Sequence, residues 1–469
     1  MTIRTDEIES PPLTTPALFR LLPLAIVLAL LVIGLALTGW LETGGELEPV
    51  AVILLVGLTI ASIPIFRRAA RNDPDGPFLF QVLFAAWLAK LAAMSVKLYL
   101  LNTVFGGAAD AVGYYRAGRT IAADLASGVL PQIQNIWGTD FVGLLTGLFF
   151  FVTGPSFVGA WIVWSWLGTL GMVLHYKAFV TAFPAGNRRL YMALVFFAPS
   201  ILMWTNALGK DALMAFTLGI TAYGAARASR SSLSVQNLLI IGLGLGGTLL
   251  VRPHIAAILM AGLVAVVLFR PIRAGMLSPV IRIGTFLGFA VLAVFVVRTS
   301  ATFINVDDLS VEGVTEFMAT EQAQTEQGGS SFTGAFPTTP QGLGLAIVTV
   351  LFRPFPWEAP GLLGLAAAAE GIVILALVLW RLGSVLRAWI YAFRDGYLAF
   401  QVVYVTLFVF FFSTIANFGI LVRQRVQLLP FLFVLLAYQL VRQESTEAQL
   451  EHDRSVDRSW RRAVERVRG

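Results

Sequence analysis

The sequence has no cysteine and little charge, and both shortages narrow the class of protein. Without cysteine there is no disulfide, no thiolate nucleophile and no cysteine-ligated zinc. The three histidines, His175, His254 and His452, are scattered, which argues against a histidine-rich metal site. Only 13% of the 469 residues are charged and 57% are hydrophobic, whereas a soluble domain is nearer a quarter charged. The composition is that of an integral membrane protein.

Apolar segments of membrane-spanning length recur along the chain. A span needs about 20 apolar residues, and fewer where the segment is kinked. We therefore expect an all-α, polytopic integral membrane helical bundle with about twelve transmembrane helices, at residues 21–40, 49–66, 78–101, 157–176, 190–205, 212–227, 235–251, 255–269, 281–298, 361–380, 397–416 and 426–441. Two shorter apolar stretches, 141–153 and 343–352, are bounded by glycine and proline and predict interfacial or re-entrant helices.

The basic residues predict how the bundle is oriented. If the N-terminus is cytoplasmic, 23 of the 33 lysines and arginines fall in the inner loops and the two termini. We expect a multi-pass protein of the inner (plasma) membrane, with cytoplasmic termini at 1–20 and 442–469 and a transmembrane domain at 21–441. Its long extracytoplasmic loops would be 102–156 and 299–360. A basic surplus of this origin does not indicate nucleic-acid binding.

The basic residues outside this pattern are informative, because each has resisted a strong bias. Several stand beside acids or aromatics in five short clusters on the predicted outer face, at 110–116, 206–211, 252–254, 353–358 and 417–425. The candidate site residues in them are Asp110, Tyr114, Tyr115, Arg116, Lys210, Asp211, Arg252, His254, Arg353, Glu358, Arg423 and Arg425.

A helical bundle could gather these clusters, which share one membrane depth, around a single cavity. Carboxylates among several cations suit a substrate with phosphate or pyrophosphate, where arginine and lysine stabilise the leaving group and a carboxylate acts as base. The alternative is that they are interfacial anchors and caps. Asp110 could cap a helix beginning near Ala111, and Tyr114 and Tyr115 could belong to an aromatic belt.

Charges within the spans need a separate interpretation. Lys90 and Glu370 lie near the middle of predicted spans, where an ionisable residue is costly. The two could pair with each other or line the cavity. Lys97, one turn from the outer surface, is expected to extend toward it. The glycines of 242–247 indicate close helix packing and not a phosphate loop.

At these clusters the sequence resembles the GT-C superfamily of membrane glycosyltransferases, which use polyprenyl-phosphate-linked sugar donors, and most of all its bacterial cell-surface polysaccharide members. The resemblance covers about residues 78–441. It implies that Asp110, in the first large outer loop, is the catalytic base and that Asp211 is the second acid of the next outer loop. It also implies a basic group near the donor phosphate, for which Arg252, His254, Arg353, Arg423 and Arg425 compete.

The chain departs from the family in two ways. Two predicted spans precede the span before Asp110, whereas the common core has its catalytic loop after the first span, and no large soluble domain is expected after the bundle. The expected reaction is inverting sugar transfer from a polyprenyl-phosphate donor to a glycan, lipid or protein acceptor, in contact with membrane lipid. We expect no cofactor, because paired cations can stabilise a phosphate leaving group, and leave a divalent cation open.

Two other functions remain open. A polysaccharide polymerase or O-antigen ligase would use Arg252 and His254 with Arg423 and Arg425 against an undecaprenyl-pyrophosphate donor. A lipid-linked-sugar flippase or transporter would distribute its charges through the depth of the bilayer.

Overall fold

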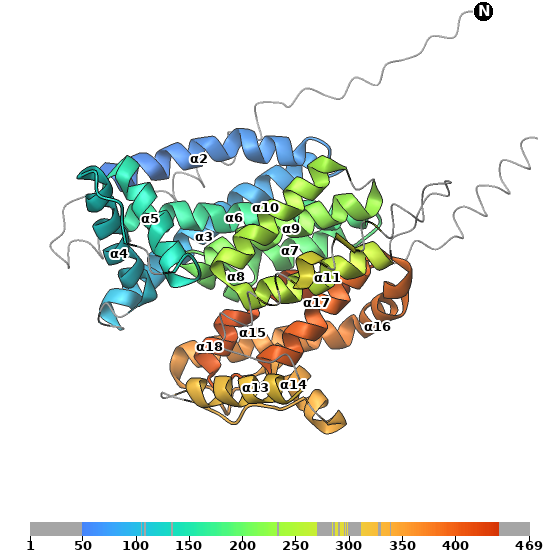
Figure 1. The fold of residues 1–469 in the computed structure, drawn as a ribbon. Coiled ribbons are helices and arrows are strands. Elements are labelled where there is room, and N and C mark those ends of the chain that lie inside the picture. Colours follow the sequence, from blue (N-terminus) through green and yellow to red (C-terminus); the bar gives the residue numbers. More distant parts are fainter. Residues whose placement is uncertain are drawn as a thin grey trace, which may run out of the picture.

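The computed structural model describes residues 49–104, 106, 109–132, 135–231, 234–269, 311–326, 330–337 and 339–439, and isolated residues between 284 and 298. Within these residues the chain is helical, and the only strand-like pairing is an isolated bridge between Ser331 and Asn417. The all-α expectation is confirmed for this part of the chain (Figure 1). The helices are α2 (Pro49–Ala70), α3 (Gly76–Thr103), α4 (Asp110–Ala126), α5 (Thr139–Thr153), α6 (Phe157–Ala182), α7 (Arg188–Phe197), α8 (Pro199–Trp204), α9 (Lys210–Arg230), α10 (Val235–Val251), α11 (Pro253–Leu268), α13 (Val311–Thr325), α14 (Pro340–Phe352), α15 (Gly361–Trp380), α16 (Leu382–Tyr391), the 3₁₀ helix η1 (Ala392–Arg394), α17 (Gly396–Phe412), α18 (Phe418–Arg425) and α19 (Leu429–Ala437).

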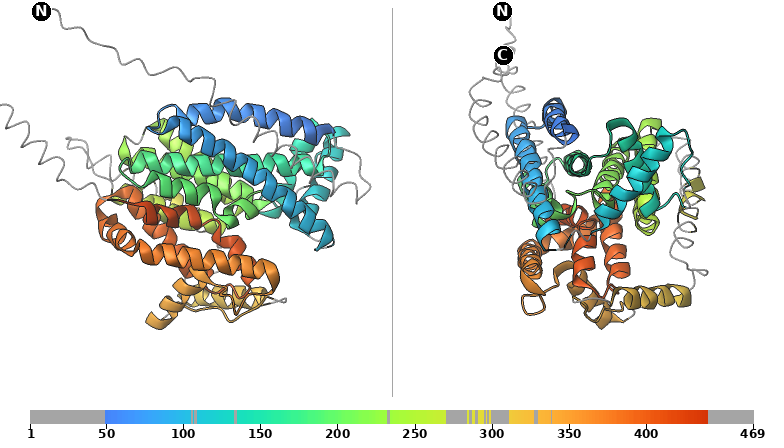
Figure 2. Two further views of the ribbon diagram at one scale, coloured as in Figure 1. Left: turned by 180° about the vertical axis from the view of Figure 1, so that it is seen from behind. Right: turned by 90° about the vertical axis from the view of Figure 1, so that its left-hand side faces the viewer.

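The long helices form a bundle with two distinct ends. In Figure 1, α4 and α5 stand at the left end, and α16 lies at the right end. The yellow helices α13 and α14 lie at the bottom of the molecule in all the views of Figures 1 and 2. The end that carries α4 and α5 is called the α4 end below, and the other is called the α16 end.

Four helices, α2, α3, α6 and α15, are long and apolar enough to cross a membrane. Two bent pairs raise the number to six if each pair is one span: α16 and η1 with α17, and α18 with α19. A membrane protein is therefore supported, but the expected count of twelve spans is not confirmed. The predicted span 21–40, half of 281–298 and both predicted cytoplasmic termini lie outside the described residues.

Several predicted spans do not form helices long and apolar enough to cross a membrane, and the reasons can be identified. Pro199 divides 190–205 into α7 and the short α8. The segments 235–251 and 255–269 form helices of 17 and 16 residues, below the length of a straight span. Helix α9 has 21 residues but carries charges in its first and last turns.

Both short apolar stretches form helices, α5 at 141–153 and α14 at 343–352. Of the predicted extracytoplasmic loop 299–360, the structure describes residues 311–326, 330–337 and 339–360. This loop contains α13 and α14, and an extended segment in it is tied to the end of α17. There, the backbone N–H of Phe332 donates to the carbonyl of Ala416 at 2.8 Å, and that of Ala335 to Ser413 at 2.9 Å.

Glycines bring α6, α9 and α10 into close contact. A Cβ on Gly219 of α9 would lie 2.5 Å from the carbonyl oxygen of Gly171 in α6. A Cβ on Gly247 of α10 would lie 2.6 Å from the Thr217 side chain of α9. The glycines of 242–247 that face α9 thus allow close packing, as predicted. This packing fixes α9, whose first turn carries Asp211.

Candidate functional site

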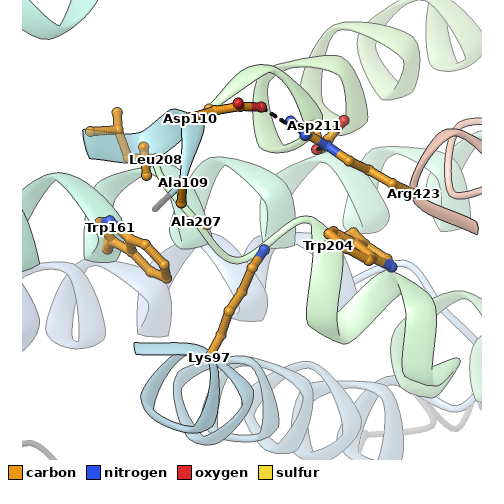
Figure 3. A pocket seen from close by; sticks show the side chains of 11 residues that line it. Lys97, Ala109, Asp110, Trp161, Trp204, Ala207, Leu208, Asp211 and Arg423 are labelled. Carbon is orange, nitrogen blue, oxygen red and sulfur yellow. Dashed lines mark hydrogen bonds and ion pairs between the residues drawn. The ribbon is translucent and has the colours of Figure 1, made fainter. Parts of the chain in front are cut away.

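A cavity of about 190 Å³ lies at the α4 end of the bundle. Its walls come from five segments far apart in the sequence: α3, the start of α4, α6, the segment from α8 to α9, and α18. The charged residues that line it are Lys97, Asp110, Asp211 and Arg423 (Figure 3).

Arg423 of α18 joins the two carboxylates of this cavity. Its Nη1 donates to Oδ2 of Asp110 at 2.7 Å, and its Nε donates to Oδ2 of Asp211 at 2.6 Å. The third nitrogen, Nη2, makes no hydrogen bond to the residues that the structure describes. Arginine is suited to this role because its planar guanidinium presents several donors in fixed directions.

Arg252, at the junction of α10 and α11, supports the same centre from the buried side. Its Nη2 donates to Oδ1 of Asp211 at 2.8 Å, and its Nη1 donates to the Gln424 side chain at 2.6 Å. The side chains of Arg252 and Asp211 are only 7% and 8% exposed. Asp211 therefore accepts charged hydrogen bonds on both oxygens and holds Arg252 and Arg423 side by side.

The two carboxylates differ in exposure and in charge environment. The Asp110 side chain is 58% exposed and faces the cavity from the first residue of α4. It makes no capping hydrogen bond to that helix, so capping does not explain it. Burial raises the pKa of the Asp211 carboxyl, but the charges of Arg423 and Arg252 outweigh this effect and hold the pKa below its usual value. Asp110 is thus the better placed proton acceptor, whereas Asp211 is committed to the arginines.

Lys97 and two tryptophans form the side of the cavity opposite the carboxylates. Figure 3 shows Lys97 extending from α3 between the rings of Trp161 and Trp204. Its Nζ donates to the carbonyl of Met203 at 3.0 Å and lies 4.9 Å from the Trp204 ring centroid and 6.0 Å from that of Trp161. Lys97 lines the cavity. Aromatic faces beside a cation suit a substrate with both apolar and charged parts.

The charges of this centre do not balance. Among the described residues, Lys97, Lys210, Arg252 and Arg423 interact electrostatically with two carboxylates, Asp110 and Asp211. Burial lowers the pKa of Lys210, and the nearby charge of Arg252 adds to the effect. The cluster keeps an excess of positive charge, which favours an anionic ligand.

Of the three α4 residues predicted beside Asp110, Tyr114 lies closest to the centre. It is 4% exposed, and burial, with the charge of Asp110, raises the pKa of its hydroxyl. Tyr115 packs edge-on against Phe150 and Phe157. Arg116 is exposed and does not line the cavity. Tyr115 and Arg116 are therefore placed to orient α4 or meet a substrate outside the cavity, not inside it.

The structure does not bring Arg353 and Glu358 to the cavity. They pair with each other at 2.7 Å, and the Glu358 carboxylate also accepts the backbone N–H of Phe355. Burial raises the pKa of Glu358, but the hydrogen bonds from Arg353 and Phe355 outweigh it and hold the pKa below its usual value. The Arg353 guanidinium lies over the Phe332 and Phe418 rings, at 4.4 and 5.2 Å.

Two further predicted residues lie near the centre, the half-buried His254 and the fully buried Arg425. His254 lies 6.0 Å from Phe412, between ring centroids, and burial with the charge of Arg252 lowers the pKa of its imidazole to about 3. Its ring is therefore neutral near pH 7. The Arg425 side chain is fully buried and donates to the carbonyl of Arg353. Neither residue lines the cavity.

The charges within the spans, Lys90 and Glu370, both bind the short helix α8 and do not pair with each other. Lys90 of α3 donates to the Thr205 hydroxyl at the end of α8. The Glu370 carboxylate of α15 accepts the backbone N–H of Ser200 at 2.9 Å and the Ser200 hydroxyl, at the start of α8. These charges position the helix that carries Trp204.

Several site features have no clear signal in the sequence. Gln424 stands between two arginines of the chain, and Trp161 and Trp204 lie within apolar runs, where tryptophan is ordinary. The signal for Lys97 was its charge in a predicted span. Among the described residues, no group of three or more histidine, aspartate or glutamate side chains could hold a metal ion.

Comparisons of the chain with models of protein families, with curated proteins and with solved structures give no match. The class is therefore defined by the fold alone. The described part of the chain is all-helical and has several helices that could span a membrane. Its function has to be argued from the cavity.

Proposed function

We propose that the protein is a membrane glycosyltransferase of the GT-C type. It transfers a sugar from a polyprenyl-phosphate donor to an extracytoplasmic acceptor, in the synthesis of a cell-envelope polysaccharide or glycoconjugate. The observation that carries the proposal is the contact of Arg423 with Asp110 and Asp211, in one cavity with Lys97 and two tryptophans.

The chemistry needs a proton acceptor beside cations that receive a leaving phosphate. Asp110 takes the proton of the acceptor hydroxyl, whose oxygen then forms a bond to the anomeric carbon. The bond from that carbon to the phosphate oxygen breaks, and its electron pair leaves with the polyprenyl phosphate. A single displacement of this kind inverts the anomeric configuration.

The cations have separate roles in this step. Arg423 offers its Nη2 group to the phosphate while Asp211 holds its Nε. Lys97 and Lys210 add positive charge, which stabilises the leaving group more strongly as negative charge develops on it. Asp211 is then a positioning residue: it orients two arginines and does not take the proton.

Turnover of a defined donor tests the proposal. The purified protein is incubated with candidate polyprenyl-phosphate sugars, and release of polyprenyl phosphate is measured. Asp110→Asn should lower the rate by about 10²–10⁴-fold, which is the usual contribution of general base catalysis. Asp124→Asn, at the other end of the same helix α4, is the matched control and should keep the rate. Normal turnover by Asp110→Asn refutes the assignment.

A polysaccharide polymerase or O-antigen ligase is the second candidate, and one observation favours it. Arg252 and Arg423 share Asp211, so two guanidiniums lie side by side, as a pyrophosphate donor requires. This function predicts that Arg252→Gln and His254→Gln abolish activity while Asp110→Asn retains it. The opposite pattern supports the glycosyltransferase.

A flippase or transporter receives less support. It requires charges along a path through the membrane, whereas Lys90 and Glu370 are bound to α8. Release of polyprenyl phosphate that depends on the donor would exclude it.

A further inference from the structure

A second and larger cavity lies toward the α16 end, away from the site described above. Its volume is about 750 Å³, within the range of ligand pockets. It is enclosed by the end of α2, the turn before α3, the second half of α6 and one side of α9. Helix α6 connects the two cavities: Trp161 in its first turns lines the smaller one, and Lys177 near its end lines the larger one.

Four cations and one acid line this cavity: Arg68, Arg71, Lys177, Arg188 and Asp73. The acid is already engaged, since Asp73 accepts the hydroxyl of Tyr176 at 2.9 Å and lies 4.0 Å from Arg188. The Lys177 Nζ donates to the carbonyl of Ala69 at 2.9 Å. The positive charge of the cavity therefore exceeds its negative charge.

Two of these cations are available to a ligand. The guanidiniums of Arg68 and Arg71 are exposed and form no ion pair or hydrogen bond with the residues that the structure describes. They lie three residues apart at the end of α2, and Lys177 faces them from α6. Arginine pairs in this arrangement bind phosphate through charge-assisted hydrogen bonds.

The remaining wall of the cavity is apolar. Leu170 and Leu174 of α6 and Phe216 of α9 line it, beside Ile65 of α2. A free anion would leave these side chains in contact with water. An amphiphile satisfies both parts of the cavity, with its phosphate at the arginines and its chains against the leucines.

The positive-inside bias explains why cations lie at this end of the bundle, but it requires no cavity. Here the cations surround a concave volume between helices, which is the form of an anionic-lipid site. We propose that this cavity binds the headgroup and upper acyl chains of an anionic phospholipid from the leaflet at the α16 end. The proposal does not depend on the sugar-transfer function.

Lipid retention by the purified full chain tests this. The protein is placed in nanodiscs of phosphatidylcholine with or without phosphatidylglycerol, extracted into detergent, and analysed for bound lipid by native mass spectrometry. We expect one phosphatidylglycerol to be retained by the unchanged protein. The double variant Arg68→Gln/Arg71→Gln should retain it about thirtyfold more weakly, which corresponds to about 1 kcal/mol for each cation.

The matched control removes the same charge at the same end. Arg387→Gln/Arg394→Gln changes two exposed arginines of α16 and η1 that do not line the cavity, and should leave retention unchanged. Leu174→Trp fills the apolar part, keeps every charge and should also abolish retention. Retention measured on monodisperse protein separates these effects from misfolding.

Four results would overturn the proposal. Equal loss of bound phosphatidylglycerol in the cavity variant and the control variant would mean that the arginines act only through surface charge. Equal retention of phosphatidylcholine would mean that the cavity does not select an anionic headgroup. If inorganic phosphate displaced the lipid, the cavity would be a site for a free anion. If Leu174→Trp retained the lipid, its chains would not lie against the apolar wall.

Discussion

Substitution of Asp211 by asparagine separates the two carboxylates of the site most clearly. The Asp211 side chain is 8% exposed and accepts hydrogen bonds from Arg252 at 2.8 Å and from Arg423 at 2.6 Å. In Asp211→Asn the Arg252 guanidinium, 7% exposed, keeps its charge without a counter-charge. Breaking a buried ion pair by removing one partner costs about 3–5 kcal/mol of stability.

The lost contact between Asp211 and Arg423 adds little to this free-energy cost, because Arg423 is partly exposed. Its side chain is 28% exposed and it retains Asp110 as a partner, so its share of the loss is nearer the range of about 0–1 kcal/mol for solvent-exposed pairs. Most of the expected destabilisation therefore comes from Arg252. We expect a total close to the range for one buried pair, about 3–5 kcal/mol.

Asp110→Asn should show the opposite pattern. Its side chain is 58% exposed, so loss of its pair with Arg423 should change stability by only about 0–1 kcal/mol. Its effect should instead be on turnover, as a lost general base. The assay compares chemical unfolding and donor turnover of both variants in one detergent. The reasoning is refuted if Asp211→Asn is as stable as the unchanged protein, or if Asp110→Asn loses as much stability.

Three further predictions follow from the same contacts. The pKa of Asp211 is lowered in the folded protein, so the ionised carboxylate contributes its full stability above the ordinary carboxyl pKa and loses it as the pH falls through the lowered value. The free energy of unfolding of Asp211→Asn should therefore depend less on pH below about pH 4 than that of the unchanged protein. Lys97→Met should lower turnover by about tenfold or more, because one cation near the leaving phosphate is lost, and should have little effect on the stability of the protein without donor. Unchanged turnover would mean that Lys97 is not part of the site. Glu370→Ala should lower thermal stability by about 1–3 kcal/mol, because the buried N–H of Ser200 loses its acceptor, whereas Glu370→Gln keeps an acceptor and should lose less.

The charge pattern of the sequence carried much information about the site. Arg252 and Arg423 stand on the predicted outer face against the positive-inside bias, and Asp110 and Asp211 lie in the same predicted clusters of charge. The structure places all four in one network. Charges that a membrane protein keeps among apolar helices need partners, and this need links the pattern to the contact.

The partners themselves could not be predicted. Lys90 and Glu370 were expected to pair with each other or to line the cavity, but each binds an end of α8. The rotation of a uniformly apolar helix leaves no trace in its sequence, so the partner of a charge within it cannot be predicted. The number of spans was equally poorly determined. A window of apolar residues does not reveal that Pro199 breaks a helix in two or that α18 and α19 bend by 56°.

Helix α8 links α15, which has a large exposed apolar surface, to the smaller cavity. Lys90 and Glu370 hold its two ends from α3 and α15, and Trp204 in its last turn lines the smaller cavity. Helix α15 exposes Leu362, Val373 and much of its remaining apolar surface. A change in bilayer thickness that tilts α15 against α3 would therefore move Trp204. By reciprocity, a ligand held against Trp204 would favour one tilt of α15 over others, so the hydrophobic thickness of the membrane and occupancy of the cavity would then form one coupled equilibrium.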